Sequence, residues 1–253
     1  QQANPTQLNN VRIVLVSTSH PGNIGAAARA MKNMGLSRLY LVQPNQHPSV
    51  ESFRRSAGAH DVLDNAVVVD KLDQAISGCV WVAGTSARLR TIEWPILEPR
   101  ECMQQATEYL EQGDVAILFG RESSGLTNEE LECCNALLHI PTNAEYSSLN
   151  LAAAVQVVSY EMRLALLEQN AGPNKAGKQK GKKHREDALA DVDQLDGLYR
   201  HLHDALNDID FFGSNNPDVV MRRLKGLLNR SSPTQREVAI LRGICSSIQN
   251  KVR

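Results

Sequence analysis

Three short segments of the sequence carry the hydroxyl, amide, carboxylate and guanidinium groups that could bind or transform a small molecule. They span residues 84–88, 119–126 and 140–151, and each follows an apolar run that is typical of a buried strand. In open parallel sheets, ligands bind outside the carboxyl ends of the strands, where the orphan N–H groups of the following helices also point. The sequence therefore predicts that these segments meet at one edge of a sheet and form a small-molecule site.

The segment over residues 120–125 offers two glycines, a carboxylate and two serine hydroxyls directly after a core strand. Glycines allow a backbone to approach a ligand closely, and the polar side chains suit the hydroxyls of a ribose. An ordinary surface loop is an equally good interpretation of these residues alone.

Another polar stretch follows the first strand and contains Asn23, Gly25 and Arg29. We expect residues 22–25 to form a turn and a helix to begin at Ala26. The Gly-x-Gly-x-x-Gly spacing of dinucleotide-binding domains and the Gly-Lys-Ser/Thr of a P-loop are missing, which disfavours a nicotinamide dehydrogenase or a nucleoside triphosphatase. Small alanine neighbours leave Arg29 room to reach a phosphate, although a plain surface arginine would look the same in the sequence.

Composition restricts the class of protein. Neither the seven histidines nor the five cysteines have the spacing of metal ligands or of a disulfide framework, so we expect no metal and a reducing, cytoplasmic environment. No apolar run reaches membrane-spanning length, and the first residues lack the charged-then-apolar pattern of a signal peptide. We therefore expect no association with a membrane.

The net charge of -1 conceals two oppositely charged parts. Residues 1–170 contain 12 Lys or Arg and 18 Asp or Glu, whereas residues 171–253 contain 15 Lys or Arg and 10 Asp or Glu. A basic C-terminal part predicts contact with a polyanion. A solvated charged surface is the alternative.

Alternating strands and helices predict an open, mostly parallel α/β sheet for the first part of the chain. The expected strands span residues 11–16, 39–42, 66–69, 80–83, 115–119 and 136–140, and the expected helices span 26–34, 51–57, 72–76, 100–110, a segment that begins near 127, and 149–167. Residues 1–10 and 88–98 are expected to be loops.

A Gly- and Lys-rich stretch separates the predicted α/β part of the chain from the C-terminal part. The sequence therefore predicts three units: an α/β domain over residues 1–170, a basic flexible linker over 171–186, and a small all-α domain over 187–253. Apolar residues at helical spacing predict helices within 188–206, 217–228 and 234–248.

Three motifs together resemble those of the SPOUT superfamily of RNA 2′-O-ribose methyltransferases, over roughly residues 11–168. They are Asn23-x-Gly25-x-x-x-Arg29, then Phe119-Gly120-Arg121-Glu122-x-x-Gly125-Leu126, then Ile140-Pro141 with Tyr146-Ser147-Ser148-Leu149-Asn150-Leu151. Each motif alone is weak evidence, but their order and spacing are specific. Residues 85–88 and 145–151, with Trp94-Pro95 and the helical tail, are similar to the bacterial tRNA methyltransferases that act on the ribose at position 32 of the anticodon loop.

The resemblance implies a fold, a cofactor and partners. The C-terminal part of the sheet domain would be tied in a trefoil knot, an exception to the rule that chains are unknotted. S-adenosylmethionine would be the methyl donor and S-adenosylhomocysteine the product. The chain would form a homodimer, with each site borrowing residues from the partner, and tRNA would be the substrate.

The resemblance also implies roles for individual residues. The catalytic group would be Arg29, Asn23, Glu122, Ser148 and Asn150. The cofactor would be bound by Thr85, Ser86, Ala87, Gly120, Ile140, Ser147, Ser148 and Leu149. RNA would be bound by Arg29, Arg88, Lys180, Lys182, Lys183, Arg222 and Arg223.

A guanidinium hardly deprotonates, so we expect Arg29 to hold a phosphate and to stabilise developing alkoxide charge rather than to act as a base. Three alternatives stay open on the sequence alone. The chain could be a non-catalytic RNA-binding or dimerisation module on the same fold, it could methylate a different RNA, or it could be an unrelated nucleotide enzyme with an α/β sheet.

Overall fold

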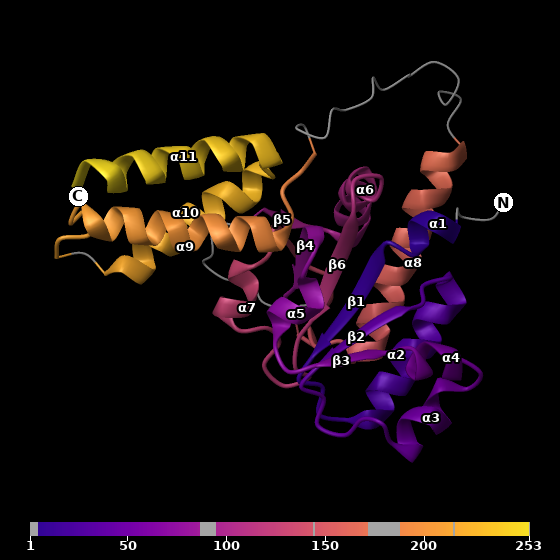
Figure 1. Ribbon diagram of the computed structural model, residues 1–253. Coiled ribbons are helices and arrows are strands. Elements are labelled where there is room, and N and C mark those ends of the chain that lie inside the picture. Colours follow the sequence, from indigo (N-terminus) through magenta and orange to yellow (C-terminus); the bar gives the residue numbers. More distant parts are fainter. Residues whose placement is uncertain (1–4, 87–94, 144, 172–187, 215, 253) are drawn as a thin grey trace.

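The computed structural model describes residues 5–86, 95–143, 145–171, 188–214 and 216–252 (Figure 1). Its centre is a seven-stranded sheet in the order β3-β2-β1-β6-β4-β7-β5, in which the neighbouring strands pair in parallel. The strands are β1 (Val11–Val16), β2 (Arg38–Val42), β3 (Val67–Val69), β4 (Cys79–Thr85), β5 (Ile96–Leu97), β6 (Asp114–Phe119) and β7 (Ala136–Leu138). The predicted α/β class is confirmed.

Helices follow most of the strands and cover both faces of the sheet (Figure 1). They are α1 (Pro5–Leu8), α2 (Pro21–Met34), α3 (Val50–Ser56), α4 (His60–Asp64), α5 (Leu72–Ile76), α6 (Pro99–Tyr109), α7 (Asn128–Glu132), α8 (Leu151–Ala171), α9 (Val192–Asp208), α10 (Pro217–Ser231) and α11 (Gln235–Val252).

The inner strand β1 is buried on both faces because its alternating side chains enter two different cores. Ile13 and Leu15 pack in the core that α2, α6 and α8 cover. Val14 and Val16 pack in the core on the opposite face, beside residues of α5 and α7. Burial on both faces is the reason that this strand is apolar in the sequence at every position except Arg12.

Helix α2 begins five residues earlier than expected. Pro21 occupies the first turn, and the His20 side chain caps the helix by accepting a hydrogen bond from the Gly22 N–H at 3.1 Å. A proline in the first helical turn lacks only an N–H that would have no partner there anyway. The prediction of a turn at residues 22–25 was therefore wrong, and Asn23 and Arg29 lie on one helix.

Three further elements lie where the sequence predicts loops or gives little signal. Helix α1, strand β5 and helix α4 are two to five residues long. Elements this short show no periodicity, since periodicity needs several turns or alternations to emerge.

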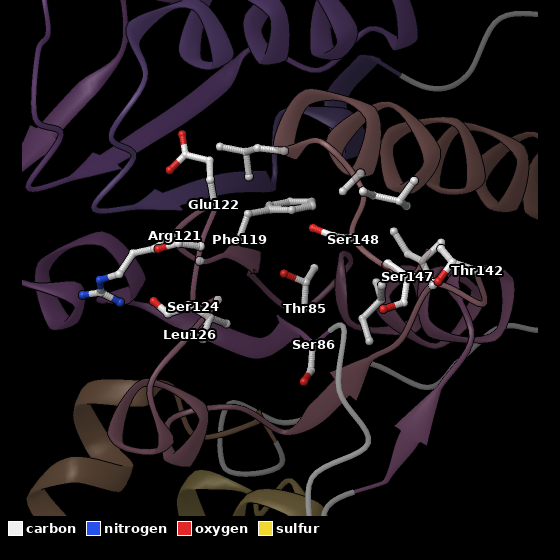
Figure 2. Close-up of a pocket in the computed structure, with 18 residues that line it drawn as sticks. Thr85, Ser86, Phe119, Arg121, Glu122, Ser124, Leu126, Thr142, Ser147 and Ser148 are labelled. Atoms are coloured by element: carbon white, nitrogen blue, oxygen red, sulfur yellow. Dashed lines mark hydrogen bonds between the residues drawn. The ribbon is translucent and has the colours of Figure 1, made fainter. Parts of the chain in front are cut away.

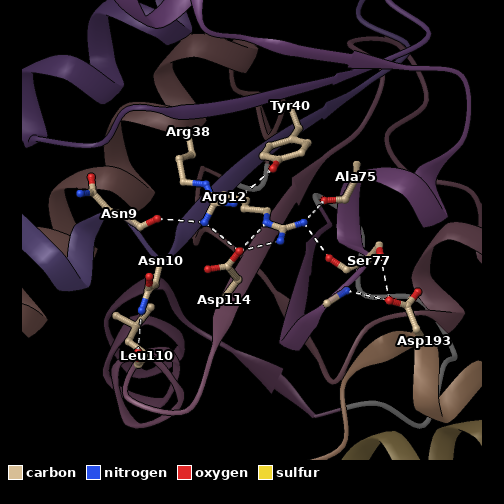
Figure 3. Close-up of polar contacts among 11 residues, drawn as sticks. Asn9, Asn10, Arg12, Arg38, Tyr40, Ala75, Ser77, Leu110, Asp114 and Asp193 are labelled. Carbon is tan, nitrogen blue, oxygen red and sulfur yellow. Dashed lines mark hydrogen bonds and ion pairs between the residues drawn. The ribbon is translucent and has the colours of Figure 1, made fainter.

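The amino ends of the strands, opposite the predicted site, are joined by a polar network (Figure 3). Arg12 is 9% exposed and donates to Asp114 Oδ2 and to the backbone oxygens of Ala75 and Ser77. Arg38 donates to the same Asp114 oxygen at 2.7 Å. These contacts satisfy a buried charge and tie β1, β2 and β6 to the end of α5, which makes the network structural.

The predicted three-helix unit is confirmed as α9, α10 and α11, which have a core of their own. It lies against the sheet domain near α5 and α7 (Figure 1). Asn229 of α10 is central to this contact, since its backbone oxygen accepts from Asn135 Nδ2 at 2.8 Å and its side chain donates to the Glu132 backbone oxygen at 2.9 Å. On α9, Asp193 accepts from the Gly78 N–H at 3.0 Å.

Candidate active site

A cavity of about 310 Å³ lies at the carboxyl ends of β4, β6 and β7 (Figure 2). Three turns form its walls, and they are the three segments that the sequence predicts to converge. Its lining residues are Thr85, Ser86, Phe119, Gly120, Arg121, Glu122, Ser123, Ser124, Gly125, Leu126, Leu138, Ile140, Thr142, Ser147, Ser148, Leu149, Leu151 and Ala154. The volume and the mixture of apolar and hydroxyl side chains suit a nucleoside-sized ligand.

The turn after β6 is closed by a pair of backbone hydrogen bonds between Arg121 and Gly125, of 3.2 and 2.8 Å. Gly125 has a φ of +72°, which glycine adopts without strain. A Cβ on Gly120 would lie 2.1 Å from the Gly125 carbonyl carbon, so a side chain cannot fit there. Both glycines of this segment are thus required by the turn, and the turn presents its backbone to the cavity.

Arg121 points away from the other lining residues (Figure 2). Its guanidinium is paired with both carboxylate oxygens of Glu130 on α7, and it also donates to Ser17 Oγ at 3.2 Å. Ser17 directly follows β1 and has a φ of +50°, an uncommon conformation for a residue other than glycine. Arg121 therefore fixes the end of β1 to the turn after β6, and Ser17 is a supporting residue that sequence reasoning missed.

Glu122 accepts four hydrogen bonds from the segment before α2 and from the first turn of this helix. The donors are the Ser19 N–H at 3.1 Å, Ser19 Oγ at 2.9 Å, the His20 N–H at 3.2 Å and Asn23 Nδ2 at 2.9 Å. Burial alone would raise the pKa of Glu122, but the hydrogen bonds from Asn23 and Ser19 outweigh it and lower this pKa to about 2. Glu122 is consequently an ionised acceptor at neutral pH and is a poor candidate for a general base.

Asn23 continues this network to the third motif. Its Oδ1 accepts from Asn150 Nδ2 at 3.0 Å, and Asn150 Oδ1 accepts from the Ala152 N–H at 2.9 Å in the first turn of α8. The orientation of both amides is thereby determined, because the ionised Glu122 can only accept from Asn23. Three of the five predicted catalytic residues therefore lie in one hydrogen-bonded chain that runs from β6 through α2 to α8.

The loop before α8 forms the open side of the cavity. Ser147 and Ser148 are both exposed, and Tyr146 and Leu149 are 81% and 40% exposed. Thr142 Oγ1 donates to the Ser147 backbone oxygen at 3.2 Å and closes the loop. Ser148, the fourth predicted catalytic residue, thus lines the cavity from this loop.

Seven of the eight residues predicted to bind the cofactor line the cavity, namely Thr85, Ser86, Gly120, Ile140, Ser147, Ser148 and Leu149. The eighth, Ala87, lies outside the described residues. His139 was not predicted, and its Nδ1 lies 3.0 Å from the Ser86 backbone oxygen, where it supports the wall of the cavity. A single histidine without a partner in its motif gives no signal in a sequence.

Arg29, the fifth predicted catalytic residue, is exposed on α2 and is not among the residues that line the cavity. Six helical residues after Asn23, its direction is rotated by about 240° from that of Asn23. Among the described residues it has no hydrogen-bond or ion-pair partner. A single chain therefore does not bring Arg29 to the Glu122–Asn23–Asn150 network.

Of the remaining residues that were predicted to bind RNA, two are described by the structure. Arg222 is paired with Glu132 of α7 and is half exposed, and Arg223 is exposed on the same helix. Arg88, Lys180, Lys182 and Lys183 lie outside the described residues.

Two further findings concern the described part of the chain as a whole. Within it, His, Cys, Asp and Glu side chains form no group of three or more that could hold a metal ion. None of the helices in these residues is both long enough and apolar enough to cross a membrane.

Comparison with known proteins gives matches to both parts of the chain. Residues 10–160 match the SpoU rRNA Methylase family, and residues 193–253 match the C-terminal domain of the tRNA methyltransferase TrmJ. The tRNA (cytidine/uridine/adenosine-2′-O-)-methyltransferase TrmJ of Pseudomonas aeruginosa is 51% identical over 97% of this chain and 96% of that protein. The tRNA (cytidine/uridine-2′-O-)-methyltransferase TrmJ of Photorhabdus laumondii is 49% identical over 96% of this chain and 98% of that protein.

Solved structures agree with these matches. The crystal structure of TrmJ from Z. mobilis superposes with a TM-score of 0.79 at 31% identity and covers 94% of this chain and 98% of that one. A probable methylase family protein from Haemophilus influenzae is 44% identical, with a TM-score of 0.63, over 97% of this chain and 98% of that one. The chain belongs to the SpoU methylase family, with the C-terminal domain that is found in the TrmJ tRNA methyltransferases.

Proposed function

We propose that this chain transfers a methyl group from S-adenosylmethionine to the ribose 2′-hydroxyl of the nucleotide at position 32 in the tRNA anticodon loop. One observation carries the proposal: the hydrogen-bonded chain of Glu122, Asn23 and Asn150 lies beside a hydroxyl-lined cavity. Relatives about 50% identical over nearly the whole chain are named tRNA 2′-O-methyltransferases, which supports both the reaction and the class of RNA.

The cavity fits the proposed cofactor. Leu126, Leu138 and Leu151 give apolar walls for a flat heterocycle, while Thr85 and the loop serines give donors and acceptors for a ribose. Gly120 and Gly125 of the tight turn also line the cavity, where they offer backbone groups to a ligand. When bound, S-adenosylmethionine supplies an electrophilic sulfonium methyl group.

The task of the protein is to align a ribose hydroxyl with that methyl group and to ease the loss of the hydroxyl proton. Asn23 and Asn150 are held in one orientation by Glu122 and by the first turn of α8, so they can position the ribose without reorganising. Arg29 would hold the adjacent phosphate and stabilise negative charge on the attacking oxygen.

A homodimer would explain why Arg29 does not reach this network within one chain. We propose that Arg29 of one protomer serves the site of its partner. Exposed apolar side chains support an interface beside the site, since Tyr146 and Leu149 of the loop and Tyr160 of α8 are 40% to 81% exposed. The expected trefoil knot around the cofactor remains a prediction.

The proposed domain boundaries assign the methyltransferase unit to residues 1–170, a linker to 171–186 and a tRNA-binding helical unit to 187–253. Arg223 and the other basic residues of α10 and α11 supply positive charge for tRNA phosphates. Binding to tRNA should therefore weaken steeply with salt. A cytoplasmic location is part of the same proposal, because it is where such a substrate would be met.

The nucleotide and its position need a direct test, because the relatives differ. The Pseudomonas aeruginosa relative is named for cytidine, uridine and adenosine, whereas other relatives are named for cytidine and uridine. A solved structure that is described as concerning the 2-OH methylation of C/U34 on tRNA is 26% identical to this chain. It covers 62% of this chain with a TM-score of 0.51. Position 34 is thus the competing target within the same loop.

The test uses tRNA transcripts in which a single ribose lacks its 2′-hydroxyl. We expect methyl transfer from labelled S-adenosylmethionine to vanish with 2′-deoxyribose at position 32 and to persist with 2′-deoxyribose at position 34, with the nucleoside identified by mass spectrometry. Transcripts with C, U or A at position 32 then rank the accepted bases. The reverse pattern would move the target to position 34.

The Arg29→Ala and Arg29→Lys variants test the proposed role of the arginine on the same transcripts. Lysine keeps the charge but loses the two-pronged guanidinium, so we expect Arg29→Lys to retain part of the activity that Arg29→Ala loses. Equal inactivity of both variants with normal tRNA binding would contradict the phosphate-holding role. Cofactor binding without transfer to any tRNA, even by the wild type, would favour another RNA or a non-catalytic binding module.

A further inference from the structure

Helix α3 is fixed directly against the segment of α2 that carries the first motif. A Cβ on Gly25 would lie 2.0 Å from the Ser52 backbone oxygen and 3.0 Å from Arg55 Cβ. Ser52 and Ser56 are fully buried on the inner face of α3, where small side chains allow this close approach. Because the two helices touch at Gly25, any side chain on the outer face of α3 has a fixed position relative to Asn23 and Arg29.

The outer face of α3 is basic. The side chains of Arg54 and Arg55 are 71% and 62% exposed. Arg29 lies one helical turn after Gly25, on the side of α2 that faces α3, and is exposed as well. Arg54 and Arg55 therefore present two guanidinium groups beside the segment of α2 that carries the first motif.

A single carboxylate holds two of these arginines in the free protein. Glu51 Oε1 accepts from Arg55 Nε at 3.0 Å, and Glu51 Oε2 accepts from Arg54. Hydrogen bonds and charges from these arginines lower the pKa of Glu51, so it is ionised at neutral pH. Exposed ion pairs of this kind contribute little to stability, so the arginines can exchange Glu51 for another anion at small cost.

A shallow hollow beside Arg54 adds an apolar surface to the basic one. It is lined by Pro48, Ser49, Val50, Phe53, Arg54 and His60. Val50 is 88% exposed, and the rings of Phe53 and His60 pack edge to face at a centroid distance of 5.7 Å. Arginines next to exposed apolar and aromatic groups are typical of surfaces that bind unpaired nucleotides, whose phosphates and bases are both accessible.

We propose that the outer face of α3 is a second RNA-binding surface, in which Arg54 and Arg55 bind phosphates of the tRNA strand that flanks the target nucleotide, in competition with Glu51. The inference rests on the proposed function for its choice of RNA. It adds a phosphate subsite in the N-terminal domain to the basic helical unit, and it assigns Glu51 the role of an internal competitor of RNA.

If Glu51 competes with RNA for the two arginines, removing the Glu51 charge should raise tRNA affinity, whereas removing the arginines should lower it. Glu51→Gln removes the competing charge, so tRNA affinity should rise by about two- to threefold. The double variant Arg54→Gln/Arg55→Gln should weaken tRNA binding by about tenfold near 0.1 M salt and reduce the slope of log affinity against log salt by about 1.4 to 1.8, as expected for two lost phosphate contacts. Binding is measured with full-length protein and S-adenosylhomocysteine, so methyl transfer does not enter the result.

The chain offers a matched control in Arg100 and Glu168. They form a similarly exposed pair, with side chains 64% and 50% exposed, between the start of α6 and the far end of α8. Arg100→Gln and Glu168→Gln should each leave the affinity and the salt slope unchanged. Thermal unfolding of every variant verifies that the fold is intact.

The outcomes separate this inference from the proposed function. The proposed RNA-binding role of α3 would be wrong if tRNA affinity fell in both Glu51→Gln and the double variant, or if it changed in neither. That conclusion would hold whether or not position 32 is methylated. Opposite effects on tRNA binding would support it even if the deoxyribose test moved the methylated position. Equal effects in the Arg100 control would also overturn it, because the response would then be a general effect of charge.

Discussion

At the scale of single residues, Glu122 shows how a carboxylate in a reaction site can act without exchanging protons. Its four hydrogen bonds lower its pKa to about 2, so it is ionised throughout the neutral range. Glu122 orients the side chain of Asn23 by accepting its hydrogen bond, and Asn23 in turn orients the side chain of Asn150. A motif that contains a glutamate does not by itself indicate a general base.

The Glu122→Gln variant tests this role by its pH dependence. The pKa of Glu122 is lower in the folded chain than its ordinary value of 4.5, so its ionisation stabilises the fold above pH 4.5, and this stabilisation is lost as the pH falls to about 2. The variant should be less stable than the wild type by about 1 kcal/mol at pH 7, a value reduced by solvent screening. In urea unfolding, the difference should shrink between pH 4.5 and 2.

The same variant should reduce kcat by at least about tenfold, because Asn23 loses a charged acceptor. The wild-type pH–rate profile above pH 5 should show no ionisation of Glu122. Glu108→Gln, the same change at an exposed carboxylate of α6 outside the cavity, is the control. A stability difference that stays constant down to pH 2 would contradict the low pKa.

At the scale of secondary structure, the glycine of the first motif has a packing role. Gly25 lies in the second turn of α2, and the backbone of α3 occupies the space that a Cβ would need. The motif therefore makes two contacts on different sides of α2. Asn23 donates a hydrogen bond to Glu122, and Gly25 packs against the backbone of α3. The sequence identifies the glycine but not the helix that approaches it.

Gly25→Ala should destabilise the fold by about 1–3 kcal/mol, because the added methyl group overlaps backbone atoms that cannot move independently. The control is Gly243→Ala in α11, where a Cβ would have nothing within 4 Å. That change should be neutral or should stabilise the fold by up to about 1 kcal/mol, as alanine favours a helix. Chemical unfolding of both variants measures the contrast, and equal effects would contradict the packing argument.

At the scale of the whole molecule, the helical unit is attached to the sheet domain through buried polar groups. Asn135 accepts from the Val82 N–H with Oδ1 and donates to the Asn229 backbone oxygen with Nδ2, both at 2.8 Å. Asn229 Oδ1 accepts from Tyr199 OH at 2.6 Å. Deletion of residues 188–253 would leave Asn135 Nδ2 without this acceptor, so point substitutions are a cleaner test of tRNA binding.

Asn229→Ala should loosen the attachment of the helical unit. It removes an acceptor from the buried Tyr199 hydroxyl and a donor from the Glu132 backbone oxygen, at a cost of about 2–4 kcal/mol. Hydrogen exchange should then increase in α9 and α10 more than in β1 and β6. Uniform change across the chain would indicate global destabilisation instead. Ser231→Ala, an exposed position on the same helix, is the control.

The sequence by itself determined the α/β class, the helical C-terminal part and the three segments that line the cavity. Buried parallel strands are nearly continuous apolar runs, and the turns at their carboxyl ends carry polar residues, so both signals are local in the sequence. Only the tertiary structure decided that helix α2 begins at Pro21, that Arg121 faces Ser17 and Glu130, and that α3 lies on Gly25. These features depend on contacts between segments that lie far apart in the chain. A polar group has several possible partners in the sequence, and the packing of the elements decides which one it meets.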